Sequence, residues 1–348
     1  MKSKVSIISA GGTVLCRESK NTKPSESGRE FISRFKKKFP FIEDIVDIIP
    51  ADPGIEYIID SACNNPRTSC DLTKAIYEEC KKEDINGIIV LHGTDTMVQS
   101  AALTAFSIEN INKPIIFTGA QKPQNDPNFD GYNNVLNSIF VVTQDLVGSY
   151  IVFANRIHKA VRTKKIDNVK LEAYRTVNEA QFGEIYNGLV SFNLRVPRRN
   201  GQNAVYSGFL NQVHTCFLYP GIDPIMLDLQ LRRQRSSIIL AYGSGNMPYD
   251  DESCPESEKY SLEGIIKKNI EEGKSIVIAS QCLEGNVDLT KYTAGYTFLK
   301  AGAIPGYDMT YEAINAKLNW ALNKTQDPKE VRRLMLKNIV GEIKIPAV

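Results

Sequence analysis

Two short segments place hydroxyl side chains beside glycines, each directly after an apolar run. GGT occupies positions 11–13 behind the run 5–10, and HGTDT occupies positions 92–96 behind the run 87–91. A hydroxyl is a potential nucleophile, and a glycine backbone can approach a reacting carbonyl closely enough to stabilise a developing oxyanion. The two segments therefore point to acyl-transfer chemistry by a hydroxyl nucleophile.

Such a hydroxyl needs a group that takes its proton. The chain has three histidines, which are far apart and lack metal-binding spacing, so we expect neither a histidine base nor a metal. A lysine that burial keeps neutral, or a tyrosine, is the substitute. The candidate lysines are Lys159, Lys164 and Lys165. Asp95 would then hold a cationic group, either that lysine or a substrate ammonium.

Each of these signals has a simpler explanation when it is taken alone. A single GGT is commonly a tight turn between a strand and a helix, Thr94 or Asp95 could cap a helix, and Lys165 could lie on a solvated hairpin. Neither glycine-rich phosphate-binding motif follows any predicted strand. The functional interpretation therefore depends on the segments meeting in space.

The elements that must bring them together follow from the alternation of apolar runs with segments of helical period. This pattern predicts a larger N-terminal domain, 1–192, with a doubly wound, mostly parallel sheet that ends in short antiparallel pieces. A helix is expected from Met97 to Ile111. A polar, basic linker, 193–212, precedes a smaller C-terminal α/β domain, 213–348. The polar segment from Cys16 to Glu30 is expected to be a long mobile loop that closes as a lid.

Ligands of an open parallel sheet bind outside the carboxyl ends of its strands. Three strand ends are therefore expected to line one site. They are the two segments above and a third one, "IIFTGAQKP", which contributes Ala120.

Composition excludes several classes of protein. The formal charge of +2 predicts neither a nucleic-acid nor an anionic-membrane partner, and the basic cluster 232–235 is expected to be a solvated helix face. Seven cysteines without a C-x-x-C pair fit a reducing cytoplasm. No apolar stretch approaches the roughly 20 residues of a membrane span. We expect no cofactor and no metal.

The motifs "SAGGTV", "IIVLHGTDTMVQSAALTAF" and "KPIIFTGAQKP" occur in the order and spacing of the asparaginase/glutaminase family. The similarity continues through "DGYNNVLNS", "NRIHKAVRTKK", "YGSGNMP", "SQCLEGNVD" and "GAIPGYDMTYEA" and so covers nearly the whole chain. The chain most resembles the cytoplasmic type I L-asparaginases.

This resemblance implies a role for each matching position. Thr13 matches the nucleophile that forms an acyl-enzyme ester, and Thr94, Asp95 and Lys165 match a second catalytic group in which the lysine activates the threonine. Lys164 remains a one-residue alternative to Lys165. The positions that match substrate contacts are Asp60, Ser61, Ala62, Gly93, Thr94, Asp95, Ala120 and Asn246.

Two of these substrate contacts, Ser61 and Asn246, need further comment: the first has a competing residue, and the second would come from another subunit. Ser69 competes with Ser61 for the substrate-holding turn. Asn246 resembles a contact that a neighbouring subunit makes, which implies a homodimer or homotetramer.

The chain also departs from the family. Members usually carry a tyrosine in the loop after GGT, and this chain has none between Thr13 and Tyr57. Within that loop the hydroxyls available as substitutes are Ser19, Thr22, Ser25 and Ser27. Lys164 and Leu240 depart from the residues expected at the allosteric asparagine site of some type I enzymes, so we do not infer that regulation.

The resemblance implies an amidohydrolase that converts L-asparagine to L-aspartate and ammonia. Three alternatives stay open: a glutaminase, the related ammonia-releasing amidotransferase subunit, and an inactive amino-acid-binding relative. The amidotransferase subunit adds an N-terminal β module, whereas this sequence starts directly on its first predicted strand.

Overall fold

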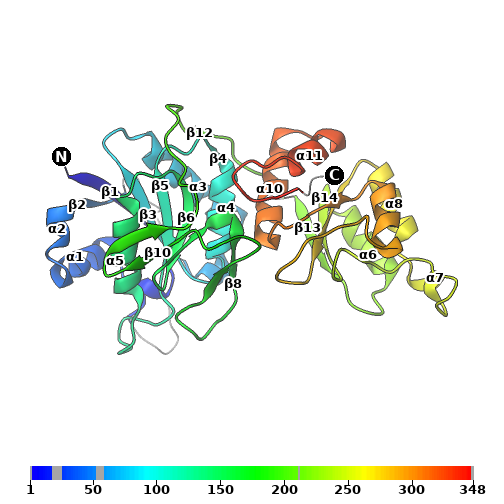
Figure 1. The fold of residues 1–348 in the computed structure, drawn as a ribbon, viewed down its shortest axis with the longest axis horizontal. Helices are drawn as coiled ribbons and strands as arrows, with labels where there is room; N and C mark the ends of the chain where they lie inside the picture. The colour runs from blue at the N-terminus through cyan, green and yellow to red at the C-terminus, as the bar shows by residue number, and fades with distance from the viewer. Residues whose placement is uncertain (1, 18–25, 52–58, 211, 346–348) are drawn as a thin grey trace. The chain divides into compact units, whose positions relative to one another are not determined.

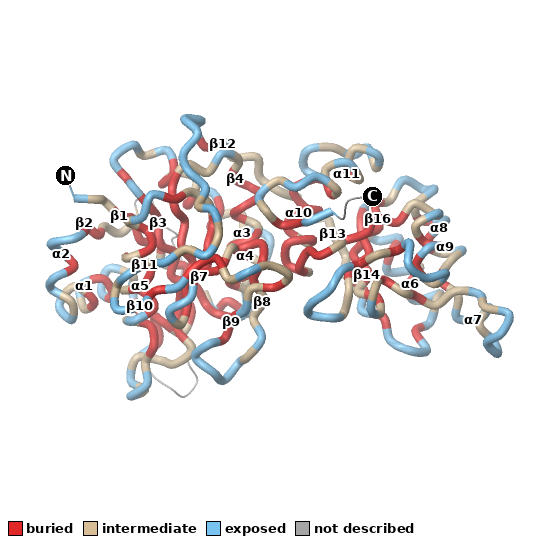
Figure 2. Tube along the Cα trace, in the orientation of Figure 1, coloured by how far each residue is buried: buried red, intermediate tan, exposed pale blue. Residues whose placement is uncertain are grey.

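The structure is a computed structural model that describes all residues except 1, 18–25, 52–58, 211 and 346–348. The chain divides into two compact units, Met1–Gly208 and Phe209–Val348. Figure 1 shows that each unit has its own sheet with helices packed around it, and Figure 2 shows that the buried residues concentrate on these central strands.

The N-terminal unit is built on an eight-stranded sheet in the order β11-β10-β7-β6-β5-β3-β1-β2. The strands β2, β1, β3, β5 and β6 are parallel, and β7, β10 and β11 extend the sheet antiparallel. The bounds are β1 Ser3–Ser9, β2 Val46–Pro50, β3 Gly87–Leu91, β5 Pro114–Thr118, β6 Gly148–Phe153, β7 Arg156–Lys159, β10 Gly183–Tyr186 and β11 Leu189–Phe192. The predicted α/β class and the mostly parallel sheet are confirmed.

Helices cover both faces of this sheet because successive strand residues point to opposite sides. On β1, Val5 and Ile7 face the core formed with α1 and α5, whereas Ile8 faces the core formed with α3 and α4. These helices span Gly28–Lys38 (α1), Pro66–Lys81 (α3), Met97–Ser107 (α4) and Gly131–Val142 (α5), and a single turn, α2, spans Ile42–Ile45.

The strand order fixes where a ligand site can form. β1 lies between β2 and β3, and the chain leaves β1 toward α1 on one face and leaves β3 toward α4 on the other. In open parallel sheets, ligands bind where the chain diverges in this way, which here is at the carboxyl ends of β1 and β3. Both of the segments that carry chemistry, 11–13 and 92–96, lie at these ends.

Two local expectations were wrong. The helix expected from Met97 to Ile111 ends at Ser107, because Ile108 and Glu109 form β4 (Ile108–Glu109), which pairs with β12 (Val205–Tyr206). Tertiary pairing here overrides the helical period. The expected loop to Glu30 also stops earlier, because Ser27 caps α1 by a reciprocal capping box with Glu30.

Outside the main sheet, a hairpin pairs β8 (Thr163–Lys165) with β9 (Tyr174–Thr176). A 3₁₀ turn, η3 (Ala160–Arg162), leads into it from β7. The hairpin carries two of the three candidate lysines.

The C-terminal unit has a four-stranded parallel sheet in the order β13-β14-β15-β16. Its strands are β13 Val213–Phe217, β14 Ser236–Ala241, β15 Ser275–Ser280 and β16 Ile304–Pro305. The helices are α6 Pro224–Arg232, α7 Ser257–Tyr260, α8 Glu263–Glu271, α9 Thr293–Ala301, α10 Tyr311–Lys324 and α11 Pro328–Met335. This matches the predicted second α/β domain. The predicted linker, 193–212, spans the division between the units and contains β12.

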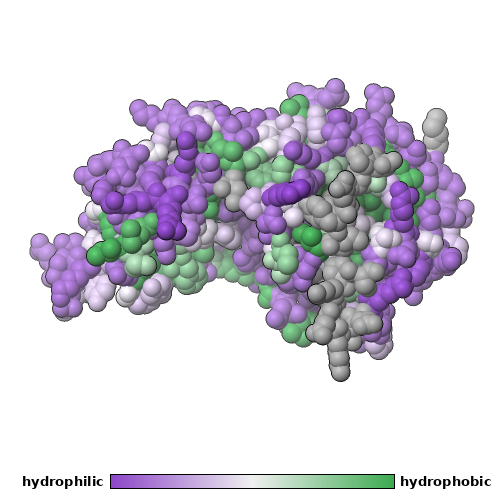
Figure 3. All heavy atoms as spheres, turned by 180° about the vertical axis from the view of Figure 1, so that it is seen from behind, coloured by the Kyte–Doolittle hydropathy of each residue, from purple (hydrophilic) through white to green (hydrophobic). Residues whose placement is uncertain are grey.

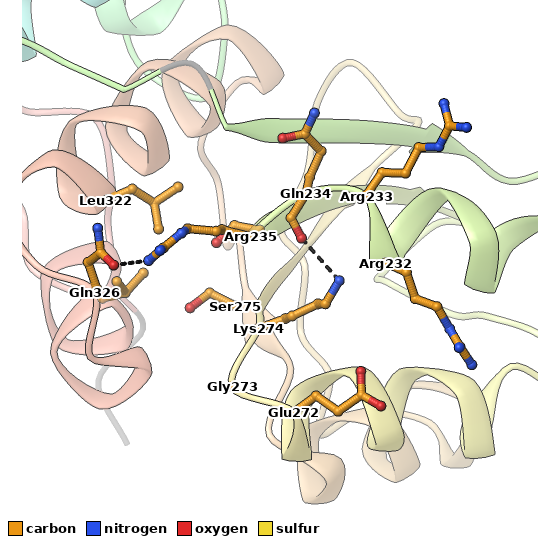
Figure 4. Close-up of a pocket in the computed structure, with 12 residues that line it drawn as sticks. Arg232, Arg233, Gln234, Arg235, Glu272, Gly273, Lys274, Ser275, Leu322 and Gln326 are labelled. Atoms are coloured by element: carbon orange, nitrogen blue, oxygen red, sulfur yellow. Dashed lines mark hydrogen bonds between the residues drawn. The ribbon is translucent and has the colours of Figure 1, made fainter.

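A pocket of about 360 Å³ lies at the amino ends of β14 and β15, and the basic cluster 232–235 lines part of it. Lys274 donates to the carbonyl of Gln234 at 3.1 Å and to that of Leu231, so its ammonium satisfies acceptors at the end of α6. Figure 4 shows Arg232, Arg233 and Arg235 pointing in three different directions. The pocket contains none of the predicted site residues.

The surface of the protein on the side shown in Figure 3 is mostly hydrophilic, with smaller hydrophobic areas.

Candidate active site

The loop after β1 joins a second loop through close backbone contact. The N–H of Gly12 donates to the carbonyl of Ile59 at 3.2 Å, and the N–H of Ile59 donates to the carbonyl of Ala10 at 3.3 Å. Gly11 and Gly12 have φ values of +120° and +88°. A Cβ on Gly11 would lie 2.0 Å from the carbonyl oxygen of Ile59. Only glycine fits at position 11, and the positive φ of Gly12 also favours glycine there, which explains the glycine pair in the loop after β1.

A third loop, after β3, packs against the same place. A Cβ on Gly12 would lie 2.3 Å from the Cα of Gly93, and a Cβ on Gly93 would lie 2.4 Å from the Oγ of Ser61. The three loops therefore touch at glycines that leave no room for a Cβ, and the Ser61 side chain packs directly against Gly93. Thr13 and Thr94 each directly follow one of these touching glycines, so the two hydroxyl-bearing residues belong to loops in direct contact.

Lys165 connects the β8–β9 hairpin to the loop after β3. Its Nζ donates to Thr94 Oγ1 at 2.8 Å and to Asp95 Oδ1 at 2.7 Å. The side chain of Lys165 is 18% exposed and that of Asp95 is 63% exposed. The amino group of Lys165 thus lies between a buried hydroxyl and a carboxylate that solvent, or a ligand, can reach.

The other two candidate lysines have different surroundings. Successive residues of a strand point to opposite faces, so Lys164 faces away from the side of the hairpin that Lys165 presents to Thr94. Lys159 pairs with Glu179 at 2.9 Å. Of the three, the structure brings Lys165 to Thr94.

Thr13 begins a short 3₁₀ helix, η1 (Thr13–Leu15), and is partly exposed. The buried Glu26 and the half-buried Gln124 form hydrogen bonds with this turn. The N–H of Glu26 donates to the carbonyl of Leu15 at 3.2 Å, and Gln124 Nε2 donates to the carbonyl of Val14 at 2.8 Å and to Glu26 Oε2 at 2.7 Å. Sequence reasoning missed Glu26 and Gln124, because both lie in polar loops with no pattern that marks burial.

The substrate-holding turn predicted from the sequence is a 3₁₀ helix, η2 (Ser61–Cys63). Asp60 is its N-cap and accepts from the N–H of Ala62 at 3.0 Å. Asp60 and Ala62 are exposed, whereas Ser61 is buried against Gly93. Ser69, the competing residue, lies in α3 and donates to Asn64 Oδ1 at 3.0 Å.

Ala120 lies in the loop after β5 and is fully buried. Asp130 shapes this loop by accepting from the N–H groups of Gln121 and Lys122, each at 3.0 Å. A Cβ on Gly119 would lie 2.3 Å from the carbonyl oxygen of His92, so the loop packs against the end of β3.

His92 is a positioning group that the sequence did not identify as one. Burial lowers its pKa, so the ring is neutral at pH 7, and its Nδ1 lies 2.7 Å from the carbonyl oxygen of Gly93. The neutral tautomer with a proton on Nδ1 donates to that carbonyl. The only sequence signal for this role was that His92 directly precedes the segment 93–95.

The remaining predicted residues lie in the C-terminal unit, at the start of α1 or outside the described residues. Asn246 lies in the C-terminal unit, in the turn after β14, where its backbone pairs with Tyr242. Ser27 is the N-cap of α1. Ser19, Thr22, Ser25 and Tyr57 lie outside the described residues.

The cluster combines a partly exposed hydroxyl with a hydroxyl–lysine–carboxylate arrangement on adjoining loops. Such groups can supply a nucleophile, a proton acceptor and a site for a substrate ammonium. Within the described ranges, no three histidine, cysteine or acidic residues are grouped to hold a metal ion. None of the helices there is long and apolar enough to cross a membrane.

Comparison with known protein families gives two matches along the chain. Residues 4–198 match the N-terminal asparaginase domain, and residues 212–335 match the glutaminase/asparaginase C-terminal domain.

Individual relatives carry two different names. L-asparaginase of Thermococcus kodakarensis is 31% identical over 287 residues, which cover 82% of this chain and 84% of the relative. A glutamyl-tRNA(Gln) amidotransferase subunit of Methanopyrus kandleri is 29% identical over 357 residues, which cover 97% of this chain and 74% of the relative. Among solved structures, the thermostable L-asparaginase from Thermococcus kodakarensis superposes with a TM-score of 0.88 at 27% identity, over 99% of this chain and 100% of that one.

Proposed function

From the premise that this chain belongs to the asparaginase family, we propose that it is an L-asparaginase that hydrolyses L-asparagine to L-aspartate and ammonia. The observation that carries the proposal is the contact of Lys165 with both Thr94 and Asp95, next to the touching glycines that precede Thr13 and Thr94. This arrangement supplies the groups that hydrolysis of an amide by a hydroxyl nucleophile requires.

In the proposed reaction, Asp95 and Asp60 hold the substrate's α-ammonium, and the turn at Ser61 and Ala62 faces its α-carboxylate. Their exposed carboxylates fit this role, because an ammonium can reach them. Gly93 and Ala120 line the site through their backbone.

In the chemical step, the oxygen of Thr13 attacks the side-chain amide carbon, and the proton that Thr13 releases is transferred to the amide nitrogen. The carbon–nitrogen bond then breaks and the nitrogen leaves as ammonia, so that an ester joins the aspartyl group to Thr13. Thr94, activated by Lys165, assists proton transfer. Water then cleaves the ester, releases L-aspartate and restores the hydroxyl of Thr13.

The test is ammonia release from L-asparagine by Thr13→Ala and Thr94→Ala. Each variant should lose about 10³-fold or more in kcat with the fold intact, because acyl formation needs both hydroxyls. Thr143→Ala, at the end of α5, is the matched control and should keep wild-type turnover. Turnover near the wild-type rate in Thr13→Ala would refute the nucleophile. A wild-type protein that binds L-aspartate without turning over either amide would instead be an amino-acid-binding relative.

A second candidate function is that of an ammonia-releasing component of an amidotransferase. The similarity to the Methanopyrus kandleri amidotransferase subunit, which extends over 97% of this chain, favours it. Ammonia release measured with and without glutamyl-tRNA(Gln) separates the two functions. Release from L-asparagine without tRNA supports the asparaginase, and release that requires the tRNA supports the amidotransferase.

We propose further that the protein acts in the cytoplasm as a homodimer or homotetramer, without nucleic acid, membrane or cofactor. By family resemblance, Asn246 of a second subunit completes the site. Sedimentation at assay concentration tests this, because a fully active monomer would exclude a shared site. Mixing inactive Thr13→Ala with inactive Asn246→Ala should restore activity if subunits exchange and share sites.

A further inference from the structure

Tyr174 is the first residue of β9, and it lies directly opposite Lys165 in the hairpin. It is 3% exposed, and its hydroxyl donates to the backbone carbonyl of Thr94 at 2.7 Å. The same threonine accepts from Lys165 through its side chain at 2.8 Å. Two facing hairpin residues therefore hold one residue of the neighbouring loop, one by its backbone and one by its hydroxyl.

The hairpin explains why both reach the same residue. Residues directly opposite each other in an antiparallel pair project to the same face, with their Cβ atoms about 5 Å apart. Lys165 and Tyr174 thus form a pair whose two polar tips converge on Thr94.

The two members of the pair differ in rigidity. Lysine has a long side chain with several rotatable bonds, whereas the tyrosine side chain has two and is more rigid. The ring of Tyr174 packs edge-on against Phe153 at 5.0 Å between centroids, which fixes its direction further. Burial, with the charges of Asp95 and Asp130, raises the pKa of Tyr174 well above its usual value, so the phenol stays a donor across the working range of pH.

We propose that Tyr174 is a positioning residue for the proposed hydrolysis: its hydroxyl fixes the backbone of Thr94 so that Oγ1 stays within reach of Lys165. The inference rests on the proposed function. Without the phenol hydroxyl, the Thr94 backbone loses this hydrogen bond to the hairpin, and the contact between Thr94 and Lys165 then depends on the long lysine side chain. Misplacement of a catalytic group lowers the rate of the chemical step more than it lowers substrate binding.

The test compares Tyr174→Phe with Tyr150→Phe in the intact oligomer. Tyr150 is a matched control because it is also 3% exposed and its hydroxyl donates to the carbonyl of Val147 at 2.9 Å, away from the site. Both variants should lower the denaturant midpoint of unfolding by similar amounts. Only Tyr174→Phe should lower kcat for L-asparagine, by about tenfold, with KM within about twofold of wild type.

The pH profile of kcat gives a second readout that a purely structural role would not move. It should change in Tyr174→Phe, because proton transfer passes through Thr94 and Lys165, and it should stay as in wild type in Tyr150→Phe. Equal kcat in the two variants, or a rise in KM alone, overturns the role of Tyr174 while leaving the asparaginase intact. A wild-type protein that releases no ammonia from either amide rejects the proposed function, and the role of Tyr174 with it.

Discussion

Two lysines of this protein each contact a carboxylate, and their surroundings differ sharply. In the C-terminal unit, Lys317 on α10 pairs with Glu342 at 2.6 Å and also donates to the carbonyls of Met335 at 2.8 Å and Lys337 at 2.6 Å. Both side chains of this ion pair are 0% exposed. In the N-terminal unit, Lys165 contacts a hydroxyl and a carboxylate, and the carboxylate is 63% exposed.

The difference separates a structural ion pair from a functional one. An ammonium has three N–H donors, and Lys317 uses them on three protein oxygens, so it ties the C-terminal segment to α10 and has none left for a ligand. Burial lowers the pKa of Lys317, and the charge of Glu342 opposes this shift. Lys165 instead lies between Thr94 and a carboxylate open to a ligand. The buried pair of Lys317 therefore supports stability, whereas the pair of Lys165 leaves Asp95 accessible to a ligand.

Replacing Lys165 should give the largest effect on activity. Lys165→Met is expected to lower kcat for L-asparagine by about 10³-fold or more, since Thr94 loses the group that activates it. The free energy of unfolding should change by no more than about 1 kcal/mol, because Asp95, the ion-pair partner of Lys165, is largely exposed to solvent. Ammonia assays and denaturant unfolding measure the two quantities. Lys164→Met is the control, and a greater loss of turnover there would show that Lys164 is the catalytic lysine.

Replacing Lys317 should give the opposite result. Lys317→Met leaves Glu342 buried without its cation, which is expected to lower the free energy of unfolding by about 3–5 kcal/mol. The kcat of the folded fraction should remain that of wild type. The double variant Lys317→Met/Glu342→Gln should recover part of the stability, because it removes the stranded charge. A lower kcat for the folded fraction of Lys317→Met would contradict the division of roles between the two lysines.

The exposed side of the Lys165 cluster should also set substrate preference. One methylene separates asparagine from glutamine, and such a difference is worth about 1–3 kcal/mol, or about 10- to 200-fold in kcat/KM. We expect asparagine to be preferred within this range. Steady-state kinetics with both amides checks the expectation, and a preference for glutamine would change the specificity but leave the roles of Thr13 and Thr94 in place.

The parts that could be predicted from the sequence are those with a local physical signal. Buried parallel strands are continuous apolar runs, so β3, β5 and β15 were evident, and glycines at strand ends marked the loops that now meet at Gly12 and Gly93. Whether Lys164 or Lys165 faces Thr94 depends on the alternation along β8 and on where the hairpin docks, which the residues of the hairpin do not encode alone.

Other features depended on distant partners. The end of α4 is set by the pairing of Ile108 with Tyr206, a residue about a hundred positions away along the chain. Glu26 is buried where Arg34 of α1 and Gln124 of another loop both contact its carboxylate. Nothing near Tyr174 in the sequence indicated that its hydroxyl would reach Thr94. Single-sequence patterns report secondary structure and strand ends, whereas long-range polar contacts need the fold itself.

An effect on stability smaller than that of Lys317→Met is expected from a buried group that carries no charge. His158 on β7 is 1% exposed, its Nδ1 lies 2.8 Å from Thr176 Oγ1, and burial, together with the charge of Arg156, lowers its pKa to about 3. The unfolded state binds a proton near pH 6.5 and the folded state does not, so stability is fully present above about pH 6.5 and is lost as the pH falls toward 3. The contribution of His158 has a slope of up to about 1.4 kcal/mol per pH unit.

This slope can be isolated by denaturant unfolding at pH 7.5, 6 and 5 in wild type and His158→Gln. His92, whose pKa burial also lowers, adds to the wild-type slope but remains in the variant, so the difference between the two slopes belongs to His158. We expect the free energy of unfolding of wild type to fall by about 2 kcal/mol more than that of the variant between pH 7.5 and pH 5. Parallel curves would mean that the folded protein admits the proton, and that this part of the N-terminal unit is as open to solvent as the Lys165 cluster.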